Sequence, residues 1–275
     1  MIYNTYIMNK NIIIKKYKPT SPGLRGRIVI KDLSLSKIQY NFFNRTLKRN
    51  KFRNSSGNLV NYHRNFGIKK LYRLIDFKRI FYNFKAKILN FEKDPNRNAL
   101  ITLIQYENGT YSYILKNDGM NLGQTIFSNT ESNPKIIIGS SYKLKDLPVG
   151  TIISNISSNN NNAAIYLRAA GTYGQFVSKN KDSNLIIFNS GKKKYFKDNV
   201  IVTVGIVAGG YLKFKKIGKA GANRWLGKRP SVRGVAMNPI DHPHGGGNGK
   251  SSGGRPSVSR WGKYTKGVVN KNRRI

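Results

Sequence analysis

The chain has 275 residues, and its 50 Lys and Arg against 11 Asp and Glu give a formal net charge of +39 at pH 7. A charge of that size repels itself strongly in isolation, so the composition predicts a polyanionic partner. The absence of cysteine excludes disulfides, thiolate catalysis and cysteine-ligated zinc fingers, so the fold must rest on an apolar core or on the partner.

Residues 1–50 are basic and weakly patterned, and we interpret them as an arm. The sequence Lys-Pro-Thr-Ser-Pro-Gly at 18–23 predicts an extended, turn-rich segment within it. The first residues have neither the features of a secretory signal nor any arginine or serine before Ser21, so no import address is expected. The bias toward Asn, Ile, Lys, Tyr and Phe is typical of AT-rich genes, which indicates an organellar genome or an AT-rich bacterium.

The pattern becomes strand-like after about residue 72. Strands are predicted at 74–77 and 86–91, and a stronger pair at 100–106 and 111–115 is rich in β-branched and aromatic residues. Asn108-Gly109 lies between the last two strands. Because Asn-Gly is the dipeptide that a type I′ turn requires, this pair is predicted to form a tight β-hairpin.

A second group of short strands follows, at the intervals typical of small β-barrels. They are predicted at 150–154, 164–167, 175–178, 185–188 and 200–204. A polar low-complexity loop at 157–162 and a tight turn at 189–191 connect some of them. No internal repeat is visible, and no helix longer than a couple of turns is predicted.

The pattern as a whole predicts an all-β protein of two successive small barrels between a basic arm and a basic tail. The predicted boundaries are 1–50 for the arm, 51–127 and 128–216 for the barrels, and 217–275 for the tail. The longest nearly apolar run, 200–212, is shorter than the roughly 20 residues of a spanning helix, so no membrane span is expected.

The segment 218–261 consists mostly of glycine, proline, small residues and cations, and such a composition cannot form a core. We expect it to take shape only against a partner. Its cations are interleaved with glycine and proline rather than with acidic residues, so a merely solvated charged face is the weaker interpretation. The pattern calls for a dense anion that backbone N–H groups can approach, which indicates a nucleic-acid backbone.

Two of the three histidines, His242 and His244, lie in the sequence Asp-His-Pro-His-Gly-Gly-Gly at 241–247. A hydrolase would use one imidazole as general base with Asp241 as its orienting group, and a metal site would use all three side chains. Neither finds a rigid frame or a nucleophile elbow in the sequence, so RNA contact is the favoured hypothesis. Trp225 and Trp261 form either a small satellite core or stacking platforms for bases, and the sequence does not separate the two.

Specific motifs lie along nearly the whole chain. In the tail they are Gly-Lys-Ala-Gly at 218–221, Arg-Trp at 224–225, Arg-Pro-Ser-Val-Arg-Gly at 229–234, the run 236–247 and Trp-Gly at 261–262; upstream they are 18–23, 72–73, 76–79, 94–97, 113–115, 148–151 and 168–173. Together they resemble the universal second protein of the large ribosomal subunit. The chain departs from that family at 63–70, where a glycine-rich turn with histidine is usual and only Gly67 and Lys69 are retained.

The resemblance implies an oligonucleotide-binding-type barrel followed by an SH3-like barrel, with a C-terminal extension threaded into ribosomal RNA near the peptidyl transferase centre. It also implies a part in assembling that centre and in joining the subunits. Because peptide-bond chemistry belongs to RNA in this family, the chain is not expected to be an enzyme. Asp241, His242 and His244 would then be positioning residues.

The RNA-binding residues that we expect lie in the matched motifs or are cations of the tail. They are Lys69, Arg73, Lys78, Arg79, Arg97, Arg168, Thr172, Lys219, Arg224, Trp225, Lys228, Arg229, Arg233, Asn238, His242, His244, Gly245, Gly246, Gly247, Lys250, Arg255, Arg260 and Trp261.

The partners expected from the resemblance are large-subunit rRNA, neighbouring ribosomal proteins and, across the subunit interface, the small subunit. No intrinsic cofactor or metal is expected, apart from Mg²⁺ that the rRNA itself brings. The expected location is the mitochondrial ribosome in the matrix, with a plastid or a bacterial cytoplasm as alternatives.

Two other functions stay open at this point. A free RNA chaperone would share the charge and the barrels, but it would be found mostly off the ribosome. A histidine-dependent nuclease would cleave RNA when purified and would lose that activity when His242 or His244 is replaced. Fractionation of native ribosomes separates these alternatives.

Overall fold

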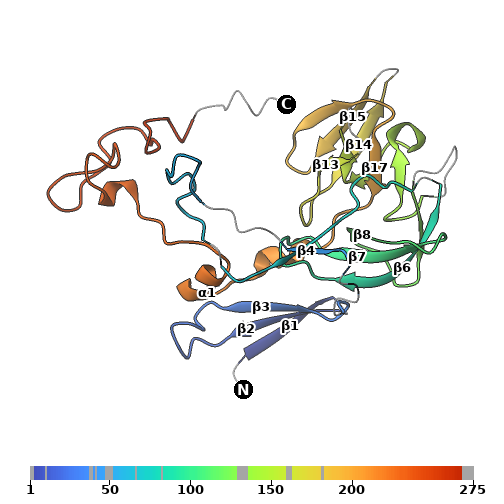
Figure 1. The fold of residues 1–275 in the computed structure, drawn as a ribbon, viewed down its shortest axis with the longest axis horizontal. Helices are drawn as coiled ribbons and strands as arrows, with labels where there is room; N and C mark the ends of the chain where they lie inside the picture. The colour runs from blue at the N-terminus through green and yellow to red at the C-terminus, as the bar shows by residue number, and fades with distance from the viewer. Residues whose placement is uncertain are drawn as a thin grey trace. The chain divides into compact units, whose positions relative to one another are not determined.

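A computed structural model describes residues 3–9, 11–36, 40, 42–46, 52–65, 67–81, 83–128, 136–158, 163–180 and 183–267 (Figure 1). Residues 159–162 of the predicted low-complexity loop lie outside these ranges. By packing, the chain forms two compact units, one of residues 1–50 and 68–222 and the other of residues 51–67 and 223–275. The predicted domain boundaries stay a prediction.

The first unit begins with an antiparallel sheet of order β1-β2-β3, where the sequence predicted only a weakly patterned arm. Its strands are β1 (Tyr3–Asn9), β2 (Ile12–Tyr17) and β3 (Ile28–Asp32). Three consecutive isoleucines open β2, and such β-branched residues favour extended backbone. The turn-rich segment 18–23 therefore connects two paired strands. Further along, β4 (Asn44–Thr46) pairs with β5 (Leu71–Arg73).

The first barrel contains a sheet of order β8-β7-β6-β9 (Figure 1). Its strands are β6 (Lys85–Glu92), β7 (Ile101–Tyr106), β8 (Tyr111–Leu115) and β9 (Thr125–Phe127), which confirms the strands predicted at 86–91, 100–106 and 111–115. Successive side chains of β7 point to opposite faces, and both faces are covered. Ile104 packs in one buried cluster, and Leu103 packs with Tyr113 in another.

The β7–β8 hairpin forms as predicted, but its turn is not of type I′. Only Gly109 of the Asn-Gly pair has a positive φ, of 78°. The N–H of Gly109 donates to the carbonyl of Tyr106 at 3.0 Å, and the N–H of Tyr106 donates to the carbonyl of Thr110 at 2.9 Å. These bonds define a three-residue loop, in which a type I turn is followed by a left-handed glycine.

The strand predicted at 74–77 is wrong, because β5 ends at Arg73. The carboxylate of Asp76 accepts the backbone N–H groups of Lys78 at 3.0 Å and Arg79 at 2.8 Å. A short side chain that bonds its own backbone two or three residues ahead competes with pairing to a neighbouring strand. The apolar pattern of this segment therefore ends in a turn.

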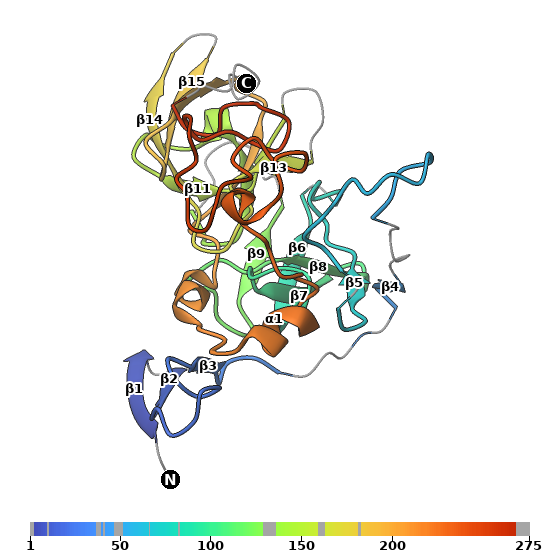
Figure 2. The same ribbon diagram turned by 90° about the vertical axis from the view of Figure 1, so that its left-hand side faces the viewer.

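The second barrel contains a sheet of order β10-β17-β11-β14-β15-β16 and a separate pair of strands, β12-β13. Strands β11, β13, β14 and β15 are labelled in Figure 2. The five predicted strands of this barrel are confirmed, and β10, β12 and β16 were not predicted. Their bounds are β10 (Ser141–Lys143), η1 (Leu144–Asp146), β11 (Ile152–Ser154), β12 (Ile156–Ser157), β13 (Ala164–Tyr166), β14 (Gly174–Lys179), β15 (Asn184–Phe188), β16 (Lys193–Phe196) and β17 (Ile201–Val204). The tight turn at 189–191 is also confirmed, since the N–H of Gly191 donates to the carbonyl of Phe188 at 2.8 Å.

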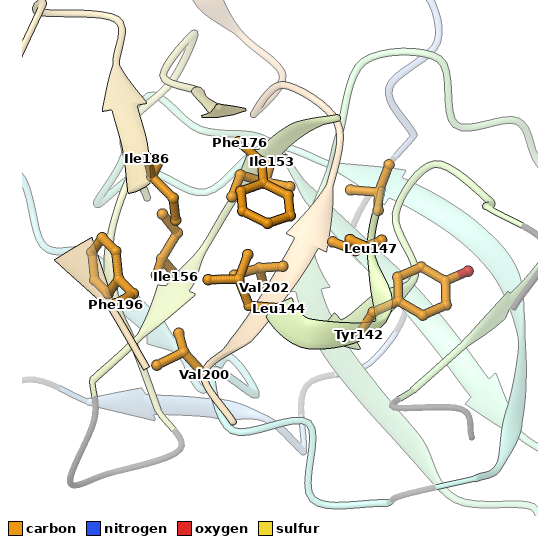
Figure 3. Packing of buried hydrophobic residues seen from close by; sticks show 11 residues of the cluster. Tyr142, Leu144, Leu147, Ile153, Ile156, Phe176, Ile186, Phe196, Val200 and Val202 are labelled. Carbon is orange, nitrogen blue, oxygen red and sulfur yellow. The ribbon is translucent and has the colours of Figure 1, made fainter. Parts of the chain in front are cut away.

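The core of this barrel draws one or two side chains from each of its strands (Figure 3). Ile153, Phe176 and Val202 face one another in its middle, and all three are fully buried. Burying an apolar side chain of this size contributes roughly 1.5–3 kcal/mol. Apolar packing therefore supports this barrel, in a chain that has no cysteine for a disulfide.

Beyond the barrels the elements are short: η2 (Gly210–Phe214), α1 (Ala220–Trp225) and η3 (Gly234–Ala236). No helix in the described part of the chain has the length and apolar character needed to cross a bilayer. From residue 223 to 267, Val258 is the one hydrophobic side chain that the structure buries. The tail thus has almost no core of its own.

Candidate nucleic-acid interface

The tail pairs with the segment 51–67, and together they make up the second unit. Arg64 and Lys228 form an antiparallel bridge. On either side of it, the N–H of Asn65 donates to the carbonyl of Gly227 at 2.7 Å, and the N–H of Arg229 donates to the carbonyl of His63 at 3.0 Å. The backbone at the start of the tail is therefore held by hydrogen bonds that the sequence did not reveal.

Two glycines allow this close approach. A Cβ on Gly227 would lie 2.6 Å from the carbonyl oxygen of Asn65, and a Cβ on Gly67 would lie 2.7 Å from the backbone nitrogen of Gly227. Both residues have a positive φ, which side chains disfavour. Gly67, the glycine retained in the divergent segment 63–70, is thus needed for packing against the tail.

The tail presents its cations to solvent. Among the exposed ones are Arg224, Lys228, Arg229, Arg233, Lys250, Arg255 and Arg260. Of these seven cations, only Arg260 is within ion-pair distance of a carboxylate in the described part of the chain, that of Asp241 at 3.8 Å. Asp241 is also the only acidic residue between position 217 and the C terminus. Cations in this arrangement attract phosphate and have almost no competing anion within the tail.

His244 is a structural residue of the tail. Its Nε2 accepts the backbone N–H of Val258 at 3.0 Å, so its Nδ1 carries the proton and donates to the carbonyl of Gly253 at 2.8 Å. The predicted contact of His244 with RNA can therefore use only the ring face. Both ring nitrogens are taken by backbone groups, and neither is available for proton transfer or metal binding.

His242 is arranged differently. Its ring stacks on that of His244, with centroids 5.0 Å apart, and its Nδ1 accepts the backbone N–H of His244 at 3.0 Å. Asp241 pairs with Arg260. Among the described residues, no three His, Asp or Glu side chains lie close enough together to hold a metal ion. This geometry does not assemble the base-and-orienter pair that a hydrolase would need.

The glycine run was expected to offer backbone N–H groups to an anion, and two of its three amides are already bonded. The N–H of Gly245 donates to the carbonyl of His242 at 2.8 Å, and that of Gly246 donates to the carbonyl of Met237 at 3.1 Å. The run closes a compact loop, in which Ser251 Oγ also donates to the carbonyl of Gly246 at 3.0 Å.

Both tryptophans are largely exposed, Trp225 by 53% and Trp261 by 69%. The ring centroids of Trp261 and Tyr62 lie 6.4 Å apart. The guanidinium of Arg260 lies over the Tyr62 ring, 5.2 Å from its centroid. Arg260, Tyr62 and Trp261 thus form an open group of flat surfaces, which suits stacking on bases better than a satellite core. Tyr62 was missed because it is far from the tail in sequence.

Two family models match the chain in succession. "Ribosomal Proteins L2, RNA binding N-terminal domain" matches residues 42–128, and "Ribosomal Proteins L2, C-terminal domain" matches residues 137–262. The chain is 41% identical to the large ribosomal subunit protein uL2m of Reclinomonas americana, over 96% of this chain and 95% of that protein. It is 40% identical to uL2 of Hyphomonas neptunium, over 95% of each chain, and 40% identical to uL2 of Rickettsia canadensis, over 95% of this chain and 96% of that protein.

The chain belongs to the ribosomal protein L2 family. It is therefore a structural constituent of the large ribosomal subunit with an RNA-binding N-terminal domain, and not an enzyme. This membership confirms the resemblance that the sequence motifs indicated, and the nearly all-β fold of the structure is consistent with it.

Two of the arginines expected to bind RNA in this L2 protein are buried instead. Arg73 is 4% exposed, and its guanidinium lies 3.9 Å from the carboxylate of Asp94. Arg79 is 5% exposed and donates to the carbonyl of Gly139 at 2.7 Å. Arg97 is half-buried, with its Nε 2.7 Å from Asp94. Sequence motifs record such structural arginines as strongly as they record ligands, so the sequence could not distinguish them.

The remaining predicted residues of the first unit divide into exposed and locally bonded ones. Lys69, Lys78 and Lys219 are exposed. Arg168 is exposed, and its guanidinium lies 4.8 Å from the centroid of the Phe77 ring. The hydroxyl of Thr172 donates to the carbonyl of Ala169 at 2.7 Å. In the tail, Asn238 has an exposed side chain, whereas its backbone carbonyl accepts the N–H of Asp241 at 3.0 Å.

A pair of lysines outside the predicted set also suits phosphate. Burial lowers the pKa of the Lys93 ammonium, and the nearby charge of Lys215 lowers it further. Like charges at close range are relieved by an anion between them, such as an RNA phosphate. The two residues are far apart in the sequence, so only the fold reveals the pair.

Proposed function

We propose that this L2 protein holds large-subunit rRNA in place around the peptidyl transferase centre and contributes no chemistry of its own. The observation that carries the proposal is the tail, with its many exposed cations and its single acidic side chain, Asp241. A segment with almost no core and such a charge gains its stability from the anion that it neutralises. The bonded imidazole of His244 supports a positioning role for the histidine loop.

We also propose a role in joining the small subunit to the large one. The family resemblance of the tail motifs supports this role, together with the neighbouring ribosomal proteins as further partners. Mg²⁺ in this setting would be bound by rRNA phosphates, because the histidine loop commits its side chains to the backbone and to Arg260.

We propose the mitochondrial ribosome as the location. The similarity to uL2m of Reclinomonas americana supports it, together with an amino-acid composition that is typical of AT-rich genes. Bacterial uL2 proteins are similar to nearly the same extent, so a bacterial cytoplasm is the main competing location and a plastid the other. Locating the gene in a nuclear, organellar or bacterial genome decides between them.

The test is to exchange the protein in reconstituted large subunits. Subunits that contain a chain ending at residue 216 should retain the protein and yet transfer peptides poorly, since the segment that we propose lies around the peptidyl transferase centre is missing.

The purified full-length protein should have no turnover on RNA or peptidyl substrates. Peptidyl transfer by the purified protein, lost in His242→Ala, would overturn the scaffolding role; normal transfer by tail-less subunits would remove the tail from the functional region. Recovery of the native protein mainly off ribosomes at moderate salt would favour a free RNA chaperone.

A further inference from the structure

A cavity of about 340 Å³ opens in the first unit. Its lining comes from the start of β2, from the end of β3 and Ser34, from the residue before β7, from the segment after β8, and from Ala208 and η2. It includes Asp32, Leu100, Lys116, Asp118, Met120 and Tyr211. The volume accommodates a single nucleobase. None of the proposed rRNA-binding residues of the tail lies in it.

The walls of this cavity are fixed by backbone bonds. The N–H of Lys116 donates to the carbonyl of Leu100 at 2.9 Å, the N–H of Ala208 donates to the carbonyl of Lys116 at 2.8 Å, and the N–H of Asp118 donates to the carbonyl of Ile206 at 2.8 Å. The polar groups of the cavity are therefore held at set positions before any ligand arrives, which lowers the entropy lost on binding.

Lys116 is a buried ammonium without a carboxylate partner among the described residues. Lys116 is 9% exposed, and its Nζ lies 3.8 Å from the centroid of the Phe91 ring. The hydrogen bond that Nζ donates to Ser34 Oγ is long, at 3.5 Å. Burial lowers the pKa of this ammonium, while the carboxylates of Asp32 and Asp118 act in the opposite direction. A buried charge in this state is stabilised by a strong hydrogen-bond acceptor.

The two carboxylates have different roles. Asp32 is already satisfied, since it accepts the N–H of Ser34 at 2.9 Å and the hydroxyls of Ser34 and Tyr211. The carboxylate of Asp118 accepts no hydrogen bond from the described residues, and partial burial raises its pKa. The cavity thus presents one unused carboxylate near one under-satisfied ammonium.

This combination selects among ligands by charge. A phosphate would meet the two carboxylates, and a cationic side chain would meet the Lys116 ammonium. A neutral group with acceptors on one side and donors on the other satisfies both. Among the RNA bases, guanine alone has two adjacent donors, N1–H and the N2 amino group, to match both oxygens of a carboxylate, and it presents O6 and N7 to a lysine. Sequence-specific RNA recognition commonly uses such unstacked bases.

We propose that this cavity binds an unstacked guanine base of RNA, with Lys116 donating to O6 or N7 and Asp118 accepting from N1 and N2. The apolar surfaces of Leu100 and Met120 would contact the ring. The proposal rests on the RNA-binding function proposed above, but it concerns a different site and adds sequence preference to a mainly electrostatic interface.

The experiment measures binding of the full-length protein to the pentamers UUGUU, UUAUU, UUCUU and UUUUU by fluorescence anisotropy at fixed salt. A bidentate base contact gives roughly five- to 150-fold discrimination, so UUGUU should bind at least about fivefold more tightly than the others. Inosine in place of guanosine lacks the N2 amino group and should lose part of that preference. Asp118→Asn and Lys116→Met should each abolish it, whereas Lys85→Met, a matched loss of one exposed lysine on β6, should leave it intact.

Circular dichroism checks that the variants fold, and Asp118→Asn at an exposed position carries the test if Lys116→Met does not. Equal affinity for all pentamers in the native protein overturns the guanine site while leaving rRNA binding in place; failure to bind any RNA overturns the proposed function itself. A preference for UUCUU replaces guanine with cytosine and overturns the assignment. Tight binding of free GMP without any preference among the pentamers assigns the cavity to a nucleotide and overturns the RNA base.

Discussion

The side chain of His244 joins the backbone of Val258 to that of Gly253, accepting from the first at 3.0 Å and donating to the second at 2.8 Å. Two bonds to one ring hold together a loop of the tail that contains few apolar side chains. The ring can do this only in one neutral tautomer, because an imidazolium has no lone pair to offer to Val258.

His244→Ala is therefore expected to loosen this loop in the free protein. An intramolecular hydrogen bond contributes about 0.5–1.5 kcal/mol, so exchange of the Val258 amide should quicken by up to roughly tenfold. Hydrogen exchange followed by NMR measures it. His242→Ala is the control, since it removes the stacked ring and its bond to the backbone N–H of His244 but leaves both ring nitrogens of His244 bonded. Equal protection in His244→Ala and the native protein would mean that the ring does not hold the loop.

The exposed tail arginines should govern the salt dependence of rRNA binding. Each phosphate contact contributes about 0.9 to the log–log slope on duplex nucleic acid, so Arg229→Ala with Arg233→Ala should lower the slope by roughly 1.8. Lys85→Ala with Lys87→Ala removes the same charge from β6 and should change the slope much less. A slope that is the same in the tail variant and in the native protein would show that these arginines do not contact phosphates.

Arg73→Ala should lower the stability of the fold and leave the salt dependence of rRNA binding unchanged. It takes a buried guanidinium away from Asp94, whose side chain is fully buried, and leaves that carboxylate with Arg97. We expect a loss of about 1–3 kcal/mol in the free energy of unfolding, measured by urea titration, with an unchanged salt slope of rRNA binding. A lower slope without a loss of stability would return Arg73 to the RNA-contacting set.

Tyr113→Phe should destabilise the first barrel. The hydroxyl of Tyr113 donates to the buried carboxylate of Glu92 at 2.9 Å, and its loss should reduce the free energy of unfolding by about 1–3 kcal/mol. A double-mutant cycle with Glu92→Ala, which leaves no side-chain acceptor at position 92, isolates the pair, and a coupling energy near zero would contradict the assignment.

The same tyrosine predicts a pH dependence. Burial, and then the bond to Glu92, raises the pKa of Tyr113 far above its ordinary value of 10.0. The folded state keeps the phenol proton at pH values where the unfolded chain has lost it, so stability falls as the pH rises above 10.0. The fall should be less steep in Tyr113→Phe. Identical pH profiles for the two proteins above that pH would exclude Tyr113 as a source of the dependence.

Gly227→Ala should separate the tail from the segment 51–67. Its Cβ would lie 2.6 Å from the Asn65 carbonyl, at a φ of 83°. Gly249→Ala is the matched control, because Gly249 has a similar φ of 88° and open space around it. We expect faster trypsin cleavage after Arg64 in the first variant than in the second. If both variants are cleaved after Arg64 faster than the native protein and at the same rate, backbone strain at a positive φ, rather than loss of the pairing, causes the faster cleavage.

Much of this molecule was predictable from the sequence, because its barrels follow local rules. β-Branched runs bounded by turn residues predicted β6, β7, β8 and most of the second barrel. The failures had local causes as well. Asp76 bonds its own backbone and ends the apolar run at 74–77 in a turn. Lys193–Phe196, which became β16, has a charged pattern that suits an edge strand and carries little strand signal.

The candidate interface was predictable in composition and much less in geometry. Charge interleaved with glycine predicted that the tail binds nucleic acid. Whether an individual residue faces outward depends on partners far away in the chain, as with Arg79 and Gly139 or His244 and Val258. The cavity around Lys116 left no mark in the sequence at all, because its polar groups come from four separate segments.

The bond between Asn65 and Gly227 also sets the order in which the molecule is completed during its own synthesis. The barrels have their strands available once the chain has grown to β17, whereas residues 51–67 emerge early and must wait until Gly227 has been made. Residues 52–61 can bond among themselves during this time, whereas the His63 carbonyl and the Asn65 N–H do not yet have the partners that the tail supplies. A nascent chain is consequently more open to proteases and to misplaced RNA around residues 63–65 until the tail has been synthesised.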